Sequence, residues 1–355
     1  MSIAFFAPLQ PPGHPMPSGD RAMGRALIAA LEAGGHCVTL ASDLRLHDRH
    51  GDTDHQDALF ARARDEVTRL LSDPQAKTWT AWLTYHNYYK APDLIGPAVA
   101  RGLGIPYLQV ESTRARKRLV GPWARFAAAA EAASDTAHTI LYVTERDAET
   151  LRRDAPEGQI LRHLPPFLAR SDLPEPSTLK GAMLSVGMMR AGDKMESYAL
   201  TARTLASLPK ALYWRLEIAG DGPKRDAVAA MMEPFGDRVR LLGALDADTL
   251  ATKYGQASLL LWPGVNEAFG LSYLEAQAAG VPVVAQNRPG VRDVVHTPLT
   301  DVTAGPTSLA SEVLHLITHP KEQRELGATA RAAVADRHLL THATNTLTKT
   351  LEGLR

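Results

Sequence analysis

Residues 263–284 read PGVNEAFGLSYLEAQAAGVPVV, and this stretch decides which fold the rest of the chain must have. The apolar run Leu259–Trp262 comes directly before it and predicts a buried strand. The stretch then predicts a loop with two glycines, a helix from about Leu271 that stops at Gly280, and a strand over Val281–Ala285. This order indicates a βα unit of a parallel sheet, where ligands bind at the carboxyl ends of the strands.

The loop in this stretch carries groups that suit an anionic ligand. The amides of residues 269–272 open the predicted helix, and their free N–H groups and the helix dipole suit a phosphate. Glu267 lies in the loop, and Glu275 lies just over one turn into the helix, with seven residues between them. A solvated helix residue is the alternative for Glu275. We expect both carboxylates to face one ligand.

The same alternation of apolar runs and helical patterns extends through nearly the whole chain. It is typical of βα units on parallel sheets that are covered on both faces. The predicted strands are Ile3–Ala7, Val38–Ala41, Thr80–Thr84, Pro106–Val110, Thr139–Val143, Met183–Val186, Arg215–Ala219, Val239–Leu242, Ser258–Trp262 and Val281–Ala285.

The periodicity breaks between Leu161 and Glu175, where prolines cluster. A chain of 355 residues is also too long for one ordinary core. We therefore predict an N-terminal Rossmann-like domain over residues 1–165 and a C-terminal one over residues 166–336. The last helix, within residues 337–355, is expected to pack back on the N-terminal domain.

Composition narrows the classes of protein. The 39 basic and 39 acidic residues cancel, which disfavours a general nucleic-acid binder. The single cysteine, Cys37, excludes an internal disulfide framework, and we expect it to be packed in a core strand. No run approaches the roughly 18 to 20 apolar residues that cross a bilayer. The short apolar N-terminus predicts a first strand rather than a signal peptide, and we expect a cytoplasmic location.

Residues 267–285, EAFGLSYLEAQAAGVPVVA, resemble the signature of retaining glycosyltransferases of the GT-B fold, in the group called family 4. The family pattern is two glutamates with seven residues between them. The resemblance extends to residues 218–223 (IAGDGP) and 239–243 (VRLLG), and to the spacing of residues 34–36 and 91–106. It implies an α/β fold of two Rossmann-like domains whose parallel sheets face across a cleft.

The resemblance also implies that a nucleotide-sugar donor binds mainly on the C-terminal domain, residues 166–336, and that the N-terminal domain, residues 1–165, is the acceptor side. Glu275 is expected to hold the ribose hydroxyls, and Glu267 and residues 268–271 to face the donor sugar and its diphosphate. Lys194 matches the family lysine that neutralises the leaving diphosphate. The full implied donor-binding set is Gly19, Gly187, Gly243, Ala268, Phe269, Gly270, Leu271 and Glu275.

One position departs from the family pattern. The family arginine usually follows the glycine that corresponds to Gly187, and this sequence has Met188 there. Arg190, two residues later, is the candidate replacement, and a surface arginine is the alternative for it.

In the N-terminal half, the family often has a histidine at the end of a strand, facing the donor sugar. His86 matches it, since Thr84–Asn87 follow the predicted strand. The family loop before the first helix usually has two glycines, and this chain has residues 18–21, SGDR. Gly19 can allow close approach of a ligand. Asp20 and Arg21 are candidates for acceptor or phosphate contact, and helix capping is an equal alternative for Asp20.

The predicted function is a retaining glycosyltransferase that moves a sugar from a nucleotide-sugar donor to a sugar, lipid or small-molecule acceptor. In this family a departing phosphate oxygen is commonly proposed to take the acceptor proton, so Glu267 is not required as a nucleophile. Residues 246–248, DAD, are expected to open a helix rather than to bind a metal. We expect no essential metal and no further cofactor.

Residues 114–126 combine basic side chains with Leu119, Val120, Trp123 and Phe126. A solvated helix or a basic rim of the acceptor site is the preferred interpretation. Weak peripheral contact with the inner face of a membrane is the alternative, and it favours a lipid acceptor.

Three rival classes remain on the residues alone. A dinucleotide-dependent oxidoreductase fails because a proline-rich loop, not G-x-G-x-x-G, follows the first strand. A phosphate-dependent sugar enzyme on the same fold is the second rival, and it can be distinguished from a transferase because its product formation depends on phosphate. A sugar-nucleotide-binding partner without catalysis is suggested only by Met188.

Overall fold

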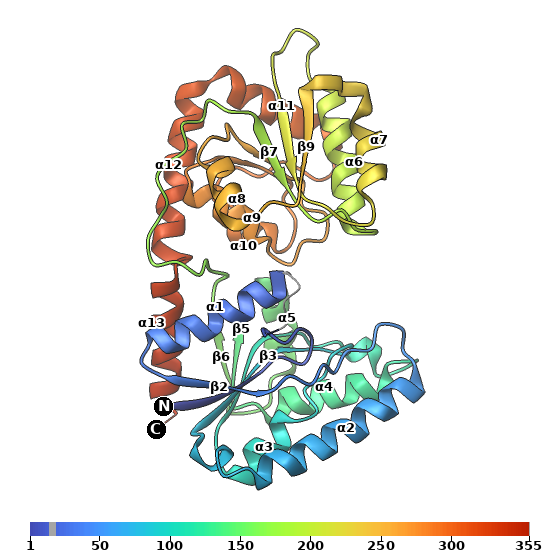
Figure 1. The fold of residues 1–355 in the computed structure, drawn as a ribbon, viewed down its shortest axis with the longest axis vertical. Helices are drawn as coiled ribbons and strands as arrows, with labels where there is room; N and C mark the ends of the chain where they lie inside the picture. Colours follow the sequence, from blue (N-terminus) through green and yellow to red (C-terminus); the bar gives the residue numbers. More distant parts are fainter. Residues whose placement is uncertain (14–18, 355) are drawn as a thin grey trace. The chain divides into compact units, whose positions relative to one another are not determined.

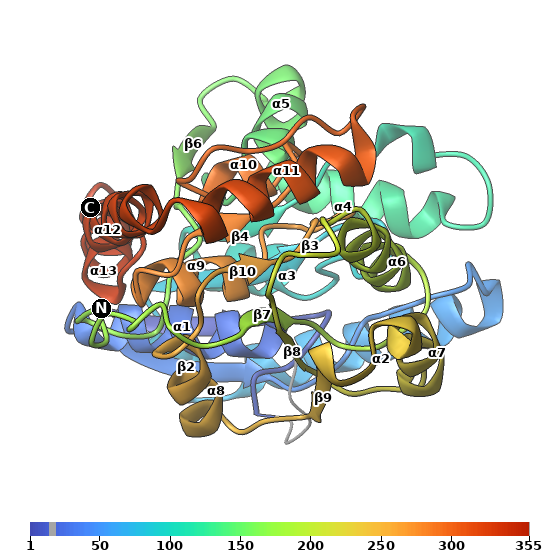
Figure 2. The ribbon, with the colours of Figure 1, turned by 90° about the horizontal axis from the view of Figure 1, so that it is seen from above.

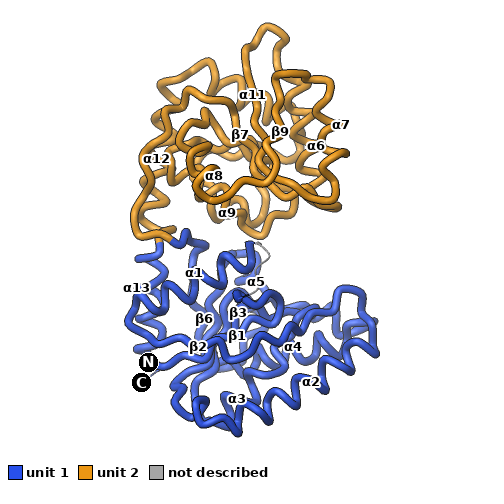
Figure 3. The backbone as a smooth tube through the Cα atoms, viewed as in Figure 1, with its two compact units in different colours: residues 1–169, 340–355 blue, residues 170–339 orange. Residues whose placement is uncertain are grey.

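The computed structural model describes residues 1–13 and 19–354, and the chain forms two compact units (Figure 3). Unit 1 holds Met1–Ala169 together with Leu340–Arg355, and unit 2 holds Arg170–Leu339. The predicted boundaries at residues 165 and 336 lie a few residues earlier in the chain. The last helix belongs to unit 1, so the chain passes between the units twice.

Unit 1 is a parallel six-stranded sheet in the order β2-β1-β3-β4-β5-β6. Its strands are β1 Ser2–Phe6, β2 Cys37–Ser42, β3 Ala81–Asn87, β4 Tyr107–Ser112, β5 Thr139–Tyr142 and β6 Ile160–His163. Its helices are α1 Gly19–Ala33, α2 Thr53–Ser72, α3 Gly96–Leu103, α4 Ala124–Thr136, α5 Glu145–Asp154 and α13 Leu340–Glu352, with the short 3-10 turns η1 Ala76–Thr78 and η2 Arg116–Arg118.

Helices cover both faces of this sheet, which is why its inner strands are almost wholly buried. Helices α2, α3 and α4 lie along one face, and α1 lies on the other, with α13 packed against it (Figure 1). Strand β1 shows the alternation. Ala4 and Phe6 join the core cluster under α2, α3 and α4, while Ile3 and Phe5 are equally buried and point the other way.

Unit 2 is a parallel five-stranded sheet in the order β11-β10-β7-β8-β9. Its strands are β7 Met183–Val186, β8 Leu216–Ala219, β9 Val239–Gly243, β10 Leu260–Leu261 and β11 Val283–Val284. Its helices are α6 Asp193–Ala206, α7 Arg225–Met232, α8 Ala247–Tyr254, α9 Leu271–Ala278, α10 Val291–Val294, α11 Gly305–Thr318 and α12 Pro320–Arg337, with the 3-10 segment η3 Glu233–Arg238.

The helices of unit 2 divide between the two faces of its sheet. Figure 2 looks along the strands and shows α6 and α7 on one side and α8 and α9 on the other. Helix α11 contacts α6, and α12 contacts α9, so each face gains a further helix. The chain reverses its direction across the sheet between β9 and β10, and this reversal moves the crossover helices to the opposite face.

Three details differ from the sequence expectations. Strand β6 was not predicted, because it is a four-residue edge strand whose Arg162 and His163 are polar and whose Ile160 is exposed. Cys37 is exposed rather than packed in the core, since it begins the edge strand β2. Strand β3 continues to Asn87, because its pairing with β4 runs on to Ser112.

Candidate functional site

The signature loop of unit 2 is fixed against the first turn of α6. The side chain of Asn266 donates to Asp193 Oδ2 at 2.9 Å, and the amide of Val265 donates to Ser197 Oγ at 3.1 Å. Gly192, just before α6, has a φ of 85°, which turns the chain into the helix. These contacts bring the loop after β10 beside Lys194, which lies 73 positions earlier in the chain.

Lys194, Glu267 and Trp262 form one interacting group at this place. The ammonium of Lys194 forms an ion pair with Glu267 Oε1 and lies 5.3 Å from the centroid of the Trp262 ring. The indole N–H of Trp262 donates to the same carboxylate oxygen at 2.8 Å. The side chains of Lys194 and Glu267 are only 20% and 10% exposed. A largely buried lysine and carboxylate are thus held in fixed positions beside the loop.

Tyr198 supports this group from α6. Its ring packs edge-on against Trp262 with centroids 5.0 Å apart, and its hydroxyl donates to the Gly187 carbonyl at 2.6 Å. A Cβ at Gly187 would lie 2.9 Å from the Trp262 ring. Gly187 therefore leaves the space that the indole needs to reach Glu267.

The loop itself needs glycine at two turns. Gly264 and Gly270 have φ values of 79° and 74°, and a Cβ at either would lie within 3.0 Å of the Tyr273 side chain. Asn266 also adopts a left-handed conformation, with a φ of 49°. Beyond these turns, the amides of residues 268–271 donate to no backbone carbonyl or side chain in the described part of the chain. They are available to an anion at the start of α9.

Glu275 lies on α9 and is largely buried. Burial raises the pKa of Glu275 above its ordinary value, although a hydrogen bond from Tyr254 lowers it in part. The Tyr254 hydroxyl donates to Oε2 at 2.9 Å. No recorded contact within the described residues joins Glu275 to Glu267 or Lys194. The two glutamates of the signature are therefore positioned by different neighbours.

Arg190 and Gly243 lie near the GDG turn that follows β8. Gly243 has a φ of 77°, and its carbonyl accepts from the Gly220 amide at 2.8 Å. Met189 is tied to this turn, because its amide donates to the Asp221 carbonyl at 2.9 Å. Arg190 is exposed, and its guanidinium has no hydrogen bond or ion pair recorded with any described residue. Arg190 and Gly243, both predicted as site residues, therefore lie in neighbouring loops at the carboxyl ends of β7, β8 and β9.

Unit 1 holds the predicted His86, near the carboxyl end of β3. Its Nε2 lies 3.6 Å from Asp20 Oδ1 and 3.9 Å from Glu111 Oε2. Asp20 lies in the first turn of α1. Gly19 begins α1 with open space where a Cβ would be, and Arg21 is buried. Ser18 lies outside the described residues.

Sequence reasoning missed three supporting residues, which are Trp262, Tyr254 and Glu111. Trp262 and Glu111 each stand at the carboxyl end of a strand, so their positions gave a usable signal. Tyr254 gave none, because it lies on α8, 21 positions away from Glu275, and only the packing of α8 on α9 brings it there.

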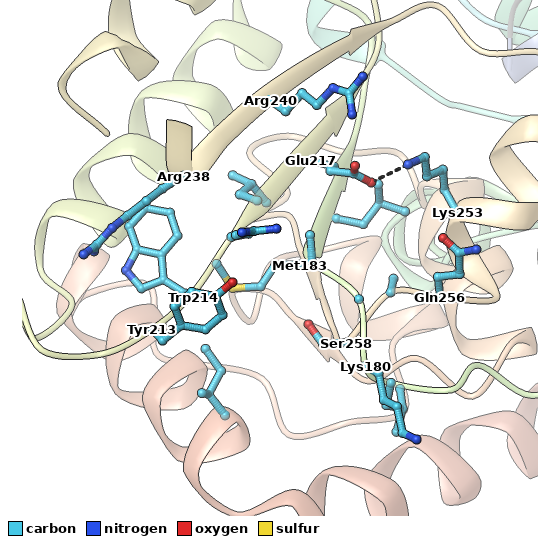
Figure 4. Close-up of a pocket in the computed structure, with 18 of the residues that line it drawn as sticks. Lys180, Met183, Tyr213, Trp214, Glu217, Arg238, Arg240, Lys253, Gln256 and Ser258 are labelled. Atoms are coloured by element: carbon cyan, nitrogen blue, oxygen red, sulfur yellow. Dashed lines mark hydrogen bonds and ion pairs between the residues drawn. The ribbon is translucent and has the colours of Figure 1, made fainter. Parts of the chain in front are cut away.

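Unit 2 also has a hollow in a different place. It holds about 620 Å³ and is lined by residues at the starts of β7, β8 and β9, the opposite strand ends from Glu267. In Figure 4, Glu217 pairs with Lys253 and Arg238 lies over Trp214. None of the predicted site residues lines it. Because this hollow lies at the opposite ends of the strands, it is not part of the site around Glu267.

Two searches bear on other kinds of site. Within residues 1–13 and 19–354, no group of three or more His, Cys, Asp or Glu side chains is placed to hold a metal ion. Asp246 of the predicted DAD segment caps α8, where it accepts from the Thr249 amide at 2.8 Å. In the same residues, no helix is both long and apolar enough to cross a bilayer.

Comparison with known families identifies the second half of the chain. Residues 181–319 match the family model described as glycosyl transferases group 1. The matched range contains Lys194, Glu267, Glu275 and the supporting Trp262, so the described arrangement lies within the residues that are similar to this family.

Relatives with sequence similarity match mainly short segments. A D-inositol 3-phosphate glycosyltransferase from Segniliparus rotundus is 36% identical over 125 residues, which are 34% of this chain and 27% of that protein. The first curated relatives are matched over only 12%, 21% and 33% of their own lengths. What the whole protein transfers, and to what, is therefore a matter for proposals.

Solved structures match over the whole chain and show its fold. Sucrose-phosphate synthase from Thermosynechococcus elongatus has a TM-score of 0.74 at 19% identity, covering 99% of this chain and 98% of that one. Anabaena HepE in complex with UDP and glucose has a TM-score of 0.72 at 14% identity, covering 99% and 100%. Both units together thus have the GT-B fold, as predicted.

Proposed function

We propose that this protein is a retaining glycosyltransferase that moves a sugar from a nucleotide-sugar donor to a hydroxyl of a sugar, lipid or small-molecule acceptor. The observation that carries the proposal is the Lys194–Glu267–Trp262 group beside the free amides of residues 268–271. A cation and several aligned N–H groups at one helix start suit the diphosphate of such a donor. The family match over residues 181–319 supports the same class of activity.

In the proposed reaction, the bond between the sugar C1 and the β-phosphate oxygen breaks while the acceptor oxygen bonds to C1. The acceptor proton passes to the departing phosphate oxygen. Negative charge grows on the diphosphate during this step, and Lys194 and the amides of residues 268–271 stabilise it. Arg190, exposed and without a recorded partner among the described residues, is the second candidate cation. These charges replace a metal ion, so we propose that the reaction needs none.

Glu267 and Glu275 have separate roles in this proposal. Both recorded contacts of Glu267 end at Oε1, which leaves Oε2 for a sugar hydroxyl. Glu275, steadied by Tyr254, is proposed to accept from the ribose hydroxyls. His86 is proposed to face the donor sugar, as the resemblance implies. We propose UDP sugars as the first donors to assay, because HepE, a structural neighbour, was solved with UDP and glucose.

The exposed apolar residues Leu119 and Val120 follow the basic turn η2. This combination favours a lipid-linked acceptor among the three acceptor classes, because a basic and apolar surface suits an anionic bilayer. Co-sedimentation with anionic vesicles, compared between the protein and Val120→Glu, tests this part separately.

The main test has two stages. Thermal unfolding is followed with a panel of nucleotides and nucleotide sugars, because a ligand that binds only the folded state raises its melting temperature. The stabilising donor is then incubated with acceptors, and the anomeric configuration of the product is read by NMR. We expect the configuration of the donor to be kept, with and without excess EDTA.

The outcomes are distinct. Inverted product refutes the retaining mechanism, and loss of turnover in EDTA refutes metal independence. Stabilisation without any transfer favours a non-catalytic nucleotide-sugar-binding protein. Product formation that depends on added phosphate favours a phosphorylase. No stabilisation by any nucleotide refutes the donor site.

A further inference from the structure

Two neighbouring strands of unit 1 bring His86 and Glu111 to the same level of the sheet. The register pairs Tyr85 with Val110 and Asn87 with Ser112, so His86 and Glu111 stand directly between these pairs. Both have a left-handed backbone, with φ values of 67° and 57°. The two side chains therefore lie next to each other near the carboxyl ends of β3 and β4.

The strand ends around this pair are anchored. Asn87 donates to the Ala130 carbonyl at 2.9 Å and accepts from the Asp93 amide at 2.9 Å. Ser112 is fully buried. The positions of His86 and Glu111 are thus set by the buried residues that follow each of them.

The polar atoms that face each other are enclosed but not hydrogen-bonded. His86 Nε2 and Glu111 Oε2 are 3.9 Å apart, and both are buried with no hydrogen-bond partner within the described residues. Both carboxylates lie on the Nε2 side of the imidazole, and no described residue is hydrogen-bonded to Nδ1. The His86 side chain is 12% exposed, so Nδ1 is the ring nitrogen that is left for a ligand.

The charges around His86 come from several elements. Glu111 on β4, Asp20 on α1 and Asp147 on α5 all act on it, and Tyr85 lies beside Glu111. Burial lowers the pKa of His86, but the charges of Glu111 and Asp20 outweigh burial and raise it above its ordinary value. Burial raises the pKa of Glu111 to about 7. The two groups act on each other, so the protonation of one depends on the protonation of the other.

We propose that Glu111 is a positioning residue for the transfer reaction, which holds the imidazole of His86 in its charged form so that Nδ1–H donates to an oxygen of the sugar substrate. This inference rests on the proposed function for the identity of the ligand. It adds a buried carboxylate behind the histidine and fixes which ring nitrogen serves the substrate. Asp20, whose side chain is 46% exposed, assists from the solvent side.

The proposed role requires the imidazolium form of His86, and this requirement fixes how transfer activity changes with pH. Activity that needs the imidazolium is present below the pKa of His86 and is lost as the pH rises through it. Glu111→Gln keeps the shape of the side chain but removes its charge, so it lowers the pKa of His86 by about one unit. The alkaline limb of the kcat profile then moves to lower pH by the same amount, while the KM for the donor changes little.

The first experiment measures the titration of His86 directly, by NMR of the imidazole nitrogens in the whole protein. We expect Glu111→Gln to lower this pKa, Glu111→Asp to restore part of it, and Asp20→Asn to lower it less, because an exposed carboxylate is screened by solvent. Glu149→Gln, on the exposed side of α5, is the matched control and leaves the titration unchanged.

The second experiment measures kcat from pH 6 to 9 for the same variants. An unchanged His86 titration in Glu111→Gln overturns the pairing even if the enzyme transfers sugar. A shifted titration without a shifted kcat profile overturns the role in the reaction. If the unmodified protein transfers no sugar, the proposed function fails, and this result is distinct from the two results above. If Glu111→Gln does not fold, Asp20→Asn carries the same comparison at an exposed position.

Discussion

Lys194 and Glu267 come from different βα units, and their ion pair lies where a donor diphosphate is proposed to bind. A bound diphosphate competes with Glu267 for the ammonium, so the lysine is already in place when charge develops on the leaving group. When the ammonium turns to the diphosphate, the indole N–H of Trp262 still donates a hydrogen bond to Glu267.

We predict that Lys194→Ala lowers kcat by about 10²- to 10³-fold, the usual loss when one group that stabilises developing charge is removed. Steady-state kinetics with the identified donor measure it. Lys321→Ala is the matched control, since that lysine is 83% exposed on α12 and pairs with its helix neighbour Glu325. Equal turnover by Lys194→Ala and the control contradicts the assignment.

A second residue-scale prediction concerns Glu275 and Tyr254. Glu275→Ala removes the proposed acceptor of the ribose hydroxyls and should weaken donor binding by about tenfold or more, since such hydrogen bonds to a charged group contribute about 1.5–3 kcal/mol. Tyr254→Phe leaves the carboxylate in place but frees Oε2, so we expect a smaller loss. Calorimetric titration of the nucleotide measures both. A larger loss for Tyr254→Phe than for Glu275→Ala argues against the direct role of the carboxylate.

At the scale of elements, the decisive unit is the loop between β10 and α9. It has two glycine turns, and the amides of residues 268–271 donate to no group in the described part of the chain. The next loop also closes on it, because Gly290 packs so tightly against the carbonyls of Glu267 and Ala268 that a Cβ would meet them at 2.6 and 1.9 Å. The conformation of the loop is therefore set by its neighbours as much as by its own sequence.

We predict that Gly270→Ala destabilises the protein by about 1–2 kcal/mol, because alanine is strained at a φ of 74° and its Cβ would lie 2.8 Å from the Tyr273 ring. Urea unfolding measures this. Gly255→Ala is the control, since that glycine ends α8 with a negative φ of −64° and its nearest Cβ neighbour is 3.5 Å away. If Gly270→Ala and Gly255→Ala have the same free energy of unfolding, the positive φ of Gly270 does not strain alanine as predicted.

The motif predicted this unit well, and the physical reason is local. Glycines, a short apolar strand and a helix pattern define a strand–loop–helix unit without reference to distant residues. Strand β6 was missed because an edge strand with polar residues has no such pattern. The end of β3 was placed too early because pairing with β4, not composition, continues the strand to Asn87.

At the scale of the whole molecule, the last helix ties the end of the chain to unit 1. Helix α13 packs on α1 through the buried residues Ala343, Leu347 and Leu351. The side chain of Arg162 on β6 donates to Thr350 at 2.8 Å. Close packing is also seen at Gly34, where a Cβ would meet the Thr348 hydroxyl at 2.6 Å.

We predict that Leu347→Ala lowers the free energy of unfolding by about 3 kcal/mol, the usual cost of truncating a fully buried leucine. Asn345→Ala, at an exposed position of the same helix, is the control. Thermal unfolding with and without the bound nucleotide separates the units, because the nucleotide is proposed to stabilise unit 2. A melting temperature unchanged from the control indicates that α13 contributes little to unit 1.

The sequence by itself determined the α/β class, the two-unit organisation and the residues of the signature loop, because hydrophobic periodicity and glycine turns are local properties of the chain. Only the tertiary structure decided which side chains act together. Lys194 meets Glu267, Tyr254 meets Glu275, and Glu111 meets His86 through strand order and helix packing. These depend on contacts between segments far apart in the sequence, and no local pattern encodes them.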